Sequence, residues 1–209
     1  MDHHDYSIPN TIFFIVYLVG GIFSTVMYLF GSPSPELGIF RPKSDYLVYL
    51  IECYGLLFIG YVPKLFSKYF HISIPNYFLV VLNLFIIGCL LLGGMLNFYT
   101  LFPIWDSFLH FMSGIVLVIL SMVILSQHKP KLSIGFMVFV AVTFAITSGV
   151  VWEILEYVLD EVTGSNSQSY KDLDGAIRVG HSALRDSMED LILELVAAIG
   201  TAIYYIRKK

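Results

Sequence analysis

The stretch "LFPIWDSFLHFMSGIVLVILSMVILS", residues 101–126, indicates the fold class of this chain. After Pro103 it continues to residue 126 with only two ionisable side chains, Asp106 and His110. A helix of about 20 apolar residues is long enough to cross the ~30 Å hydrocarbon core of a bilayer. Side chains four residues apart share one face of a helix. The stretch therefore predicts a membrane-spanning helix with an acid and a histidine stacked at its start.

The composition of the whole chain is that of an integral membrane protein. Hydrophobic residues make up 57% of the sequence and charged residues 13%, and the mean hydropathy is +0.77. Soluble domains have about 25% charged residues. The formal net charge is -4 and the basic residues are scattered, so the chain offers no basic surface for nucleic acid. We expect membrane lipids, and not nucleic acid, as its partners.

Six stretches are long and apolar enough to be expected as spanning helices of one all-α bundle. They cover residues 11–31, 46–63, 77–98, 104–126, 132–158 and 187–206. The connections between them are short, except for a polar segment at 159–186. We therefore expect a single transmembrane domain over 1–209, with one polar extramembrane loop at 159–186.

The distribution of basic residues suggests an orientation in the membrane. Six spans place both termini on one side, and that side carries seven Lys and Arg residues against five on the other. Cytoplasmic loops are enriched in these residues. The count leans toward cytoplasmic termini and places the 159–186 loop on the outer side.

The alternating direction of the helices brings ionisable residues from several spans to one membrane face. The fourth span starts at this face, the fifth ends there and the sixth starts there. His110 lies about 6 Å further in than Asp106, at ~1.5 Å per residue. The residues that reach this layer are Asp106, His110, Glu153, Glu156, Asp186 and Asp190, and Glu52 in the second span lies at a similar depth.

Each of these acids also has an ordinary structural explanation. Asp106 could cap a helix after Pro103, and Asp186 and Glu189 could favour the positive end of the sixth helix. Glu153 could be merely interfacial. These explanations do not account for two acids at the end of the fifth helix, where the helix dipole favours basic residues. The convergence of acids therefore predicts a site.

Close carboxylates need a partner that offsets their repulsion. Arg178 and Arg185 could pair with one or two of them, and a divalent metal ion could neutralise more. Carboxylate oxygens with one imidazole suit Zn, Mn or Fe. The expected metal ligands are Asp106, His110, Glu153, Asp186 and Asp190, with Glu156 as a catalytic base nearer to water.

Other residues near the layer have more ordinary roles. The Ser-Gly pairs at 113–114 and 148–149 are expected to allow close approach of helices, and catalysis by the serines is the less favoured interpretation. Trp105 and Trp152 flank the acids and indicate an aromatic belt or a wall of the site. His181, in the long loop, is an additional candidate ligand.

A family resemblance is carried by four runs: "YVPKLFSKYFHISIPN", "NFYTLFPIWDSFLHFMSG", "WEILEYVLD" and "RDSMEDLILELVAAIG". They resemble the YjdF-type family of bacterial inner-membrane proteins, which has no assigned biochemical function. The resemblance covers about residues 46 to 200. It implies a bacterial cytoplasmic membrane location and a polar site on the D-x-x-x-H, W-E-x-x-E and D-x-x-x-D elements. Members tend to be richer in acids and tryptophan before the last helix, where this chain has "VGHSALRDS".

Three classes of function fit these observations. A metal-dependent membrane hydrolase would activate water against a lipid headgroup, a peptide or another small molecule. A proton- or cation-coupled transporter would use the same acids, although such sites usually lie near the midplane between repeats. A scaffold protein would use them to anchor the 159–186 loop. We favour the metal site; a homo-oligomer is compatible with all three.

Overall fold

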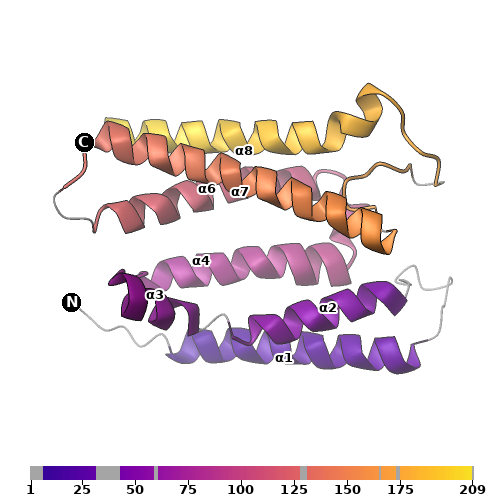
Figure 1. Cartoon of the computed structure of the whole chain (residues 1–209). Helices are drawn as coiled ribbons and strands as arrows, with labels where there is room; N and C mark the ends of the chain where they lie inside the picture. The colour runs from indigo at the N-terminus through magenta and orange to yellow at the C-terminus, as the bar shows by residue number, and fades with distance from the viewer. Residues whose placement is uncertain are drawn as a thin grey trace. The chain divides into compact units, whose positions relative to one another are not determined.

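The computed structural model of this chain is helical, as the sequence predicts (Figure 1). It describes residues 7–31, 43–58, 61–127, 131–164, 166–172 and 175–208. Within these residues the only extended pairing is an isolated bridge between Lys171 and Ile177. The chain forms two compact units, Met1–Pro103 and Ile104–Lys209. A single domain over 1–209 stays a prediction.

The first unit is built from α1 (Ser7–Phe30), α2 (Lys43–Leu56), α3 (Val62–Phe70), α4 (Asn76–Ile87), η3 (Gly88–Met95) and α5 (Phe98–Leu101). Helices α1 and α2 pack along each other, and the π-helix η3 continues α4 and contacts α2. The buried Tyr17 hydroxyl donates a hydrogen bond of 2.9 Å to Asn83 Oδ1, which joins α1 to α4. The hydroxyls of Thr25 and Tyr54 lie 3.1 Å apart and join α1 to α2. Buried polar pairs of this kind satisfy groups that lipid cannot solvate.

The second unit consists of α6 (Trp105–Leu125), α7 (Ile134–Thr163) and α8 (His181–Arg207), and each helix packs against the other two. Its apolar core contains Val118, Met122, Met137, Val138, Ala141, Ala145, Ala198 and Ala202. These residues lie toward the end of the unit where α6 ends and α7 begins. The opposite end, where α6 and α8 begin and α7 ends, holds the ionisable side chains.

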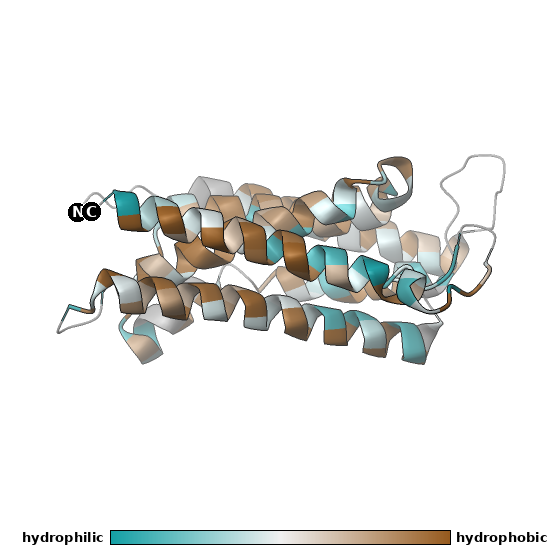
Figure 2. Cartoon of the chain, turned by 90° about the horizontal axis from the view of Figure 1, so that it is seen from above, coloured by the Kyte–Doolittle hydropathy of each residue, from teal (hydrophilic) through white to brown (hydrophobic). Residues whose placement is uncertain are grey.

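Among the residues that the structure describes, four helices are long and apolar enough to cross a membrane: Asn10–Phe30, Asn76–Met95, Trp105–Leu125 and Ile134–Val162. They correspond to the first, third, fourth and fifth predicted stretches. Figure 2 shows hydrophobic residues along the helices. Many large hydrophobic side chains, Phe139 among them, are exposed, as expected of helices in contact with lipid.

The structure does not support the predicted count of six spans. Helix α2 has 14 residues, fewer than the ~20 that a perpendicular crossing needs. Helix α8 has 27 residues, but Glu189, Asp190 and Glu194 interrupt its apolar sequence. Insertion of such residues into lipid is unfavourable.

The polar connection before α8 is shorter than the predicted 159–186 loop. Helix α7 continues to Thr163, where Gly164, with a φ of 72°, ends it in the left-handed conformation that favours glycine. Helix α8 already begins at His181. Residues 159–163 and 181–186, which the sequence analysis placed in the loop, are therefore helical.

Candidate functional site

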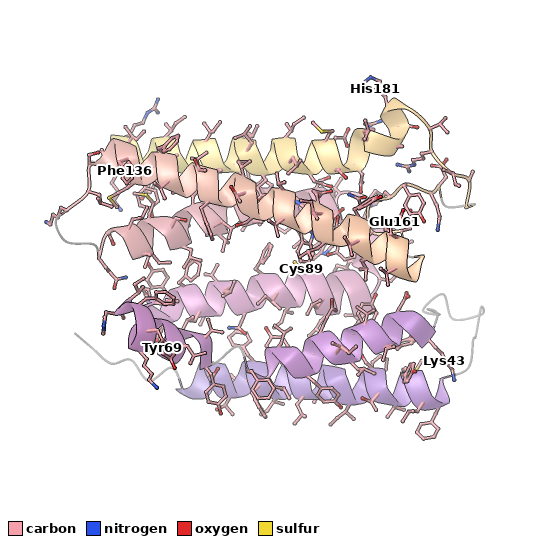
Figure 3. All side chains as sticks on the ribbon, in the orientation of Figure 1. Lys43, Tyr69, Cys89, Phe136, Glu161 and His181 are labelled. Carbon is pink, nitrogen blue, oxygen red and sulfur yellow. The ribbon has the colours of Figure 1, made fainter. Side chains whose placement is uncertain are left out.

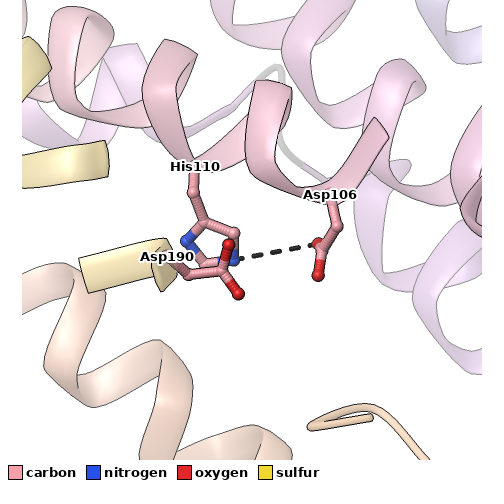
Figure 4. A group of neighbouring side chains, drawn as sticks. All are labelled: Asp106, His110 and Asp190. Carbon is pink, nitrogen blue, oxygen red and sulfur yellow. Dashed lines mark ion pairs between the residues drawn. The ribbon is translucent and has the colours of Figure 1, made fainter. Parts of the chain in front are cut away.

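Asp106, His110 and Asp190 place three ligand atoms within 4.8 Å of one another. Asp106 and His110 project from successive turns of α6, and Asp190 approaches the imidazole from α8 (Figure 4). His110 is 6% exposed and Asp190 3% exposed. His110 Nε2 lies 3.8 Å from Asp106 Oδ1. The three side chains therefore share one largely buried location.

Glu153 brings the third helix of the unit to the same imidazole. It is buried on α7, and its Oε1 lies 4.0 Å from His110 Nε2. This oxygen accepts no hydrogen bond from the residues that the structure describes. The other oxygen, Oε2, accepts one long hydrogen bond of 3.4 Å from Gln168 Nε2. All three helices of the second unit thus contribute to one cluster.

The distances at His110 Nε2 are informative about what the cluster can bind. Separations of 3.8 and 4.0 Å are too long for hydrogen bonds. Two atoms that each lie ~2.0–2.2 Å from one metal ion are roughly 3–4.4 Å apart in tetrahedral or octahedral geometry. The carboxylate oxygens of Asp106 and Glu153 therefore lie at ligand spacing from the imidazole nitrogen. Asp106, His110 and Asp190 form a group that could hold a metal ion.

Glu156 and Asp186 lie beside this cluster, outside the group of three. Glu156 is half-buried, and its Oε1 accepts a hydrogen bond of 2.9 Å from Trp152 Nε1. Asp186 is half-buried in the second turn of α8. Burial raises the pKa of Asp186 above its ordinary value, although a hydrogen bond from Ser169 and the charge of Arg178 act in the opposite direction. Asp186 therefore favours its neutral form more than a solvated aspartate does.

The two arginines that could have neutralised the layer pair with other acids. Arg178 Nε lies 2.7 Å from Asp172 Oδ1, and Arg185 Nε lies 2.6 Å from Glu189 Oε1. Within the described residues, no lysine or arginine forms an ion pair with the carboxylates of the cluster. The carboxylates of the cluster would repel one another when ionised, and a bound cation would offset that repulsion.

Three other predicted roles have different outcomes. Asp106 does not cap α6, because the capping position is Ile104 and no side chain makes a capping hydrogen bond. His181 is exposed at the first residue of α8 and points away from the helices in Figure 3, which argues against its role as a ligand. Glu52 belongs to α2 in the first unit, and its place in the layer stays a prediction.

Asp160 and Gln168 are site residues that the sequence analysis missed. The buried Asp160 carboxylate accepts hydrogen bonds from the backbone N–H groups of Ser167, at 2.7 Å, and Gln168, at 3.0 Å. The Gln168 side-chain amide then donates to the Glu153 carbonyl at 3.2 Å and to Ser187 Oγ at 3.1 Å. Asp160 therefore fixes the loop after α7 so that Gln168 lies against Glu153.

Glu194 is a further missed residue, one turn beyond Asp190 on α8. It is 1% exposed, and neither carboxylate oxygen has a hydrogen bond within the described residues. The hydroxyl of Ser113 lies nearby but donates to the His110 carbonyl at 2.7 Å. A Cβ atom on Gly149 would overlap Glu194 Oε2, so the absence of a side chain there makes room for the carboxylate.

Helical spacing was the signal for two of these residues. Glu194 follows Asp190 by four residues, the same interval that separates Asp190 from Asp186. Asp160 lies seven residues after Glu153, which places both on one face of α7. No comparable sequence pattern points to Gln168, because its position depends on how the connection between α7 and α8 folds.

The apolar helices and the buried ionisable cluster define a multi-pass membrane protein with a polar site. A sequence model of the DUF2238 family, described as predicted membrane protein, matches residues 12–209, and the chain belongs to this family. A protein of Thermotoga maritima described as uncharacterized is 29% identical over 151 residues, which are 72% of each chain. No solved structure matches the chain. The family supports the membrane assignment and leaves the YjdF-type resemblance unconfirmed.

Proposed function

We propose that this protein is a metal-dependent hydrolase of the bacterial cytoplasmic membrane. Its Zn, Mn or Fe ion would be bound by Asp106, His110, Glu153 and Asp190. The observation that carries the proposal is the convergence of carboxylate oxygens from α6 and α7 on His110 Nε2, at 3.8 and 4.0 Å without a hydrogen bond between them. An imidazole with several carboxylates is a ligand set of these metals.

The residues around the cluster suit hydrolysis. A bound metal ion would lower the pKa of a water molecule in the site. Glu156 is the proposed general base, and the hydrogen bond that its carboxylate accepts from Trp152 Nε1 orients it. Glu156 would accept a proton from water and pass it to the leaving group. Asp186, nearer the start of α8, would add a ligand or negative charge at the entrance.

The position of the cluster in the unit indicates the class of substrate. It lies where α6 and α8 begin and α7 ends, so the scissile bond would lie near the level of lipid headgroups. An ester, a phosphoester or a peptide bond of a lipid or of a small amphipathic molecule would fit this depth. Gln168, which the loop holds against Glu153, would contact such a substrate or the ligand Glu153.

The proposal includes the finer topology expected from the sequence. Helix α8 packs along α6 and α7, and α2 packs along α1. This packing against apolar helices supports a membrane location for α8 and for α2. With six spans the termini would be cytoplasmic and the connection between α7 and α8 would lie outside. The excess of Lys and Arg on the side of the termini supports this orientation.

Cation or proton transport is the second candidate, and Glu194 is the observation that favours it. Its carboxylate continues the series of acids on α8 about 6 Å deeper than Asp190, at ~1.5 Å per residue. A buried series of acids is typical of ion pathways in membrane proteins. Carboxylate-to-amide changes at Glu153 or Asp190 would then abolish pH-dependent flux, with no bound transition metal to lose.

Elemental analysis of the protein tests the proposal directly. Wild type, His110→Ala and Asp106→Asn would be purified in detergent without chelator, beside His71→Ala as a control on an exposed histidine of the first unit. We expect stoichiometric transition metal in wild type and in His71→Ala, and a loss in the two site variants. Wild-type protein free of such metal would contradict the metal site and favour transport.

A further inference from the structure

Glu194 is a buried carboxylate that the four-ligand metal site does not use. Its side chain is 1% exposed, and both oxygens lack a hydrogen bond within the described residues. Burial of an unpaired charge is strongly unfavourable, so buried acids usually have a basic or metal partner. We therefore expect a basic group or a metal ion close to the Glu194 carboxylate.

The surroundings of Glu194 come from all three helices of the second unit. On α6, Gly114 lies against the Glu194 backbone, and the hydroxyl of Ser113 is committed to a carbonyl of its own helix. On α7, Gly149 faces the Glu194 carboxylate, and the charge of Glu153 acts on it. No basic side chain in the described part of the chain pairs with it. The groups near its carboxylate are thus acidic or small.

The charge of the buried carboxylates is compatible with more than one cation in the cluster. The site carboxylates Asp106, Glu153 and Asp190 together with Glu194 carry four negative charges when ionised. His110 is a neutral ligand when it binds a metal ion. One divalent cation would offset two of the four charges, whereas two divalent cations would offset them all. A second cation would also give Glu194 its missing partner.

We propose that Glu194 and Glu153 bind a second divalent cation, on the Glu194 side of the first, so that the site holds two metal ions. Glu153 would be shared, because its Oε1 faces His110 and its Oε2 has only a 3.4 Å hydrogen bond. Carboxylates from facing helices hold metal pairs in helical bundles, and paired ions ~3.5–4 Å apart clamp both oxygens of a hydrolytic displacement. The inference rests on the proposed function, since the first ion uses Glu153 and Asp190.

Reconstitution with manganese tests the second ion. Metal-free protein would be loaded with Mn²⁺, and bound metal would be measured together with the electron paramagnetic resonance spectrum. We expect two Mn²⁺ per chain with a spin-coupled signal in wild type, and one Mn²⁺ with an isolated-ion signal in Glu194→Gln. The control is Glu189→Gln, an exposed acid of the same helix paired with Arg185, which should keep two.

A second variant, Gly149→Ala on α7, changes the position of the Glu194 carboxylate. In Gly149→Ala the new methyl group would overlap the end of a flexible side chain, Glu194, and would displace its carboxylate without altering its chemistry. We expect one Mn²⁺ per chain here also, which tests the inference if Glu194→Gln does not fold. One ion in wild type and in both variants alike would overturn the second site and leave the first. No ion in wild type would overturn both.

Discussion

The carboxylate of Asp160 accepts a hydrogen bond of 3.0 Å from the backbone N–H of Gln168, and this contact joins the loop after α7 to the helix that it leaves. A second bond, from the Ser167 N–H at 2.7 Å, completes the anchor. Because Gln168 in turn contacts Glu153, the loop is part of the candidate site. Asp160 therefore affects the candidate site indirectly, because it positions Gln168.

Asp160→Ala should loosen this loop and weaken the site. Hydrogen bonds to a charged group contribute about 1.5–3 kcal/mol each, so we expect the loss of both bonds to lower the unfolding free energy by about 3–6 kcal/mol. Hydrogen–deuterium exchange at 166–170 should rise in the same variant. Asp172→Ala, which removes an exposed acid paired with Arg178, is the control and should cost under about 1 kcal/mol. Equal protection of the loop in Asp160→Ala and wild type would show that Asp160 is not its anchor.

Gly114→Ala should separate α6 from α8. A Cβ atom at this position would overlap the backbone oxygen of Glu194 and lie 3.1 Å from Ala197 Cβ and 3.2 Å from Ala198 N. Backbone atoms cannot move aside as a side chain can, so we expect a loss of about 1–3 kcal/mol, typical of overpacking. Thermal unfolding in detergent measures it.

The matched control for this variant is Gly135→Ala on α7. A Cβ atom there would meet nothing within 4 Å. Alanine is favoured over glycine in a helix by about 0.5–1 kcal/mol, so stability should rise slightly or stay the same. If Gly114→Ala were equally neutral, the close contact of α6 with α8 would not contribute to stability.

In each unit, two predicted spans match described helices that are long and apolar enough to cross a membrane, and one, 46–63 or 187–206, does not. The run 104–126 is uniformly apolar after its first turns and appears as α6, Trp105–Leu125. The run 46–63 is also largely apolar, although it contains Glu52, and α2 ends at Leu56. Hydropathy predicts whether a segment favours an apolar environment, and it does not predict where a helix ends. Gly55 and Pro63, which disfavour continuous helix, were the local signals there.

The candidate site could be predicted as far as helical periodicity determines it. Spacing and helix direction place Asp106, His110 and Asp190 at one end of the bundle, and the structure brings them within 4.8 Å. The contacts of Gln168 could not be predicted, because the conformation of a loop follows from the folded helices. The burial of Glu194 depends on the packing at Gly149, which no one-dimensional pattern reveals.

Asp186 should make the stability of the metal-free protein depend on pH. Burial raises the pKa of Asp186 in the folded state above the unfolded value of about 3.9. The stability linked to this group is therefore fully present below about pH 4 and is lost as the pH rises through the folded pKa. Asp186→Asn should match wild type near pH 3.5 and be more stable near pH 8, in thermal unfolding with chelator present. A lower stability of the variant at pH 8 would mean that the charged form is favoured by the fold.

Cysteine labelling should place the two ends of α7 on opposite sides of the membrane. In a chain with Cys53 and Cys89 replaced by alanine, Ser167→Cys should react with an impermeant maleimide in intact cells. Gln127→Cys should react only after permeabilisation, because α7 lies between the two positions. Ala145→Cys, which is fully buried, is the unreactive control. The reverse pattern would invert the orientation, and equal labelling would show that α7 does not cross.

Glu156→Gln should separate metal binding from turnover. The amide keeps the size of the side chain and cannot accept a proton from water, so bound metal should stay at the wild-type level. A general base contributes about 10²–10⁴-fold, so hydrolysis of a fluorogenic lipid ester or peptide should fall by at least ~100-fold. Trp152→Phe, which removes the 2.9 Å hydrogen bond to Glu156, should lower turnover by a smaller factor of roughly 10-fold.

The control for this last comparison is Glu161→Gln, an exposed acid on the same helix, which should keep both metal and turnover. Turnover in Glu156→Gln at the wild-type rate would exclude this residue as the base and leave the metal site itself intact. Loss of metal together with turnover would instead make Glu156 a ligand. A variant with normal metal content but no turnover is the one result that requires both a metal ion and a separate proton acceptor, because a carboxylate that only shaped the site would change the two quantities together.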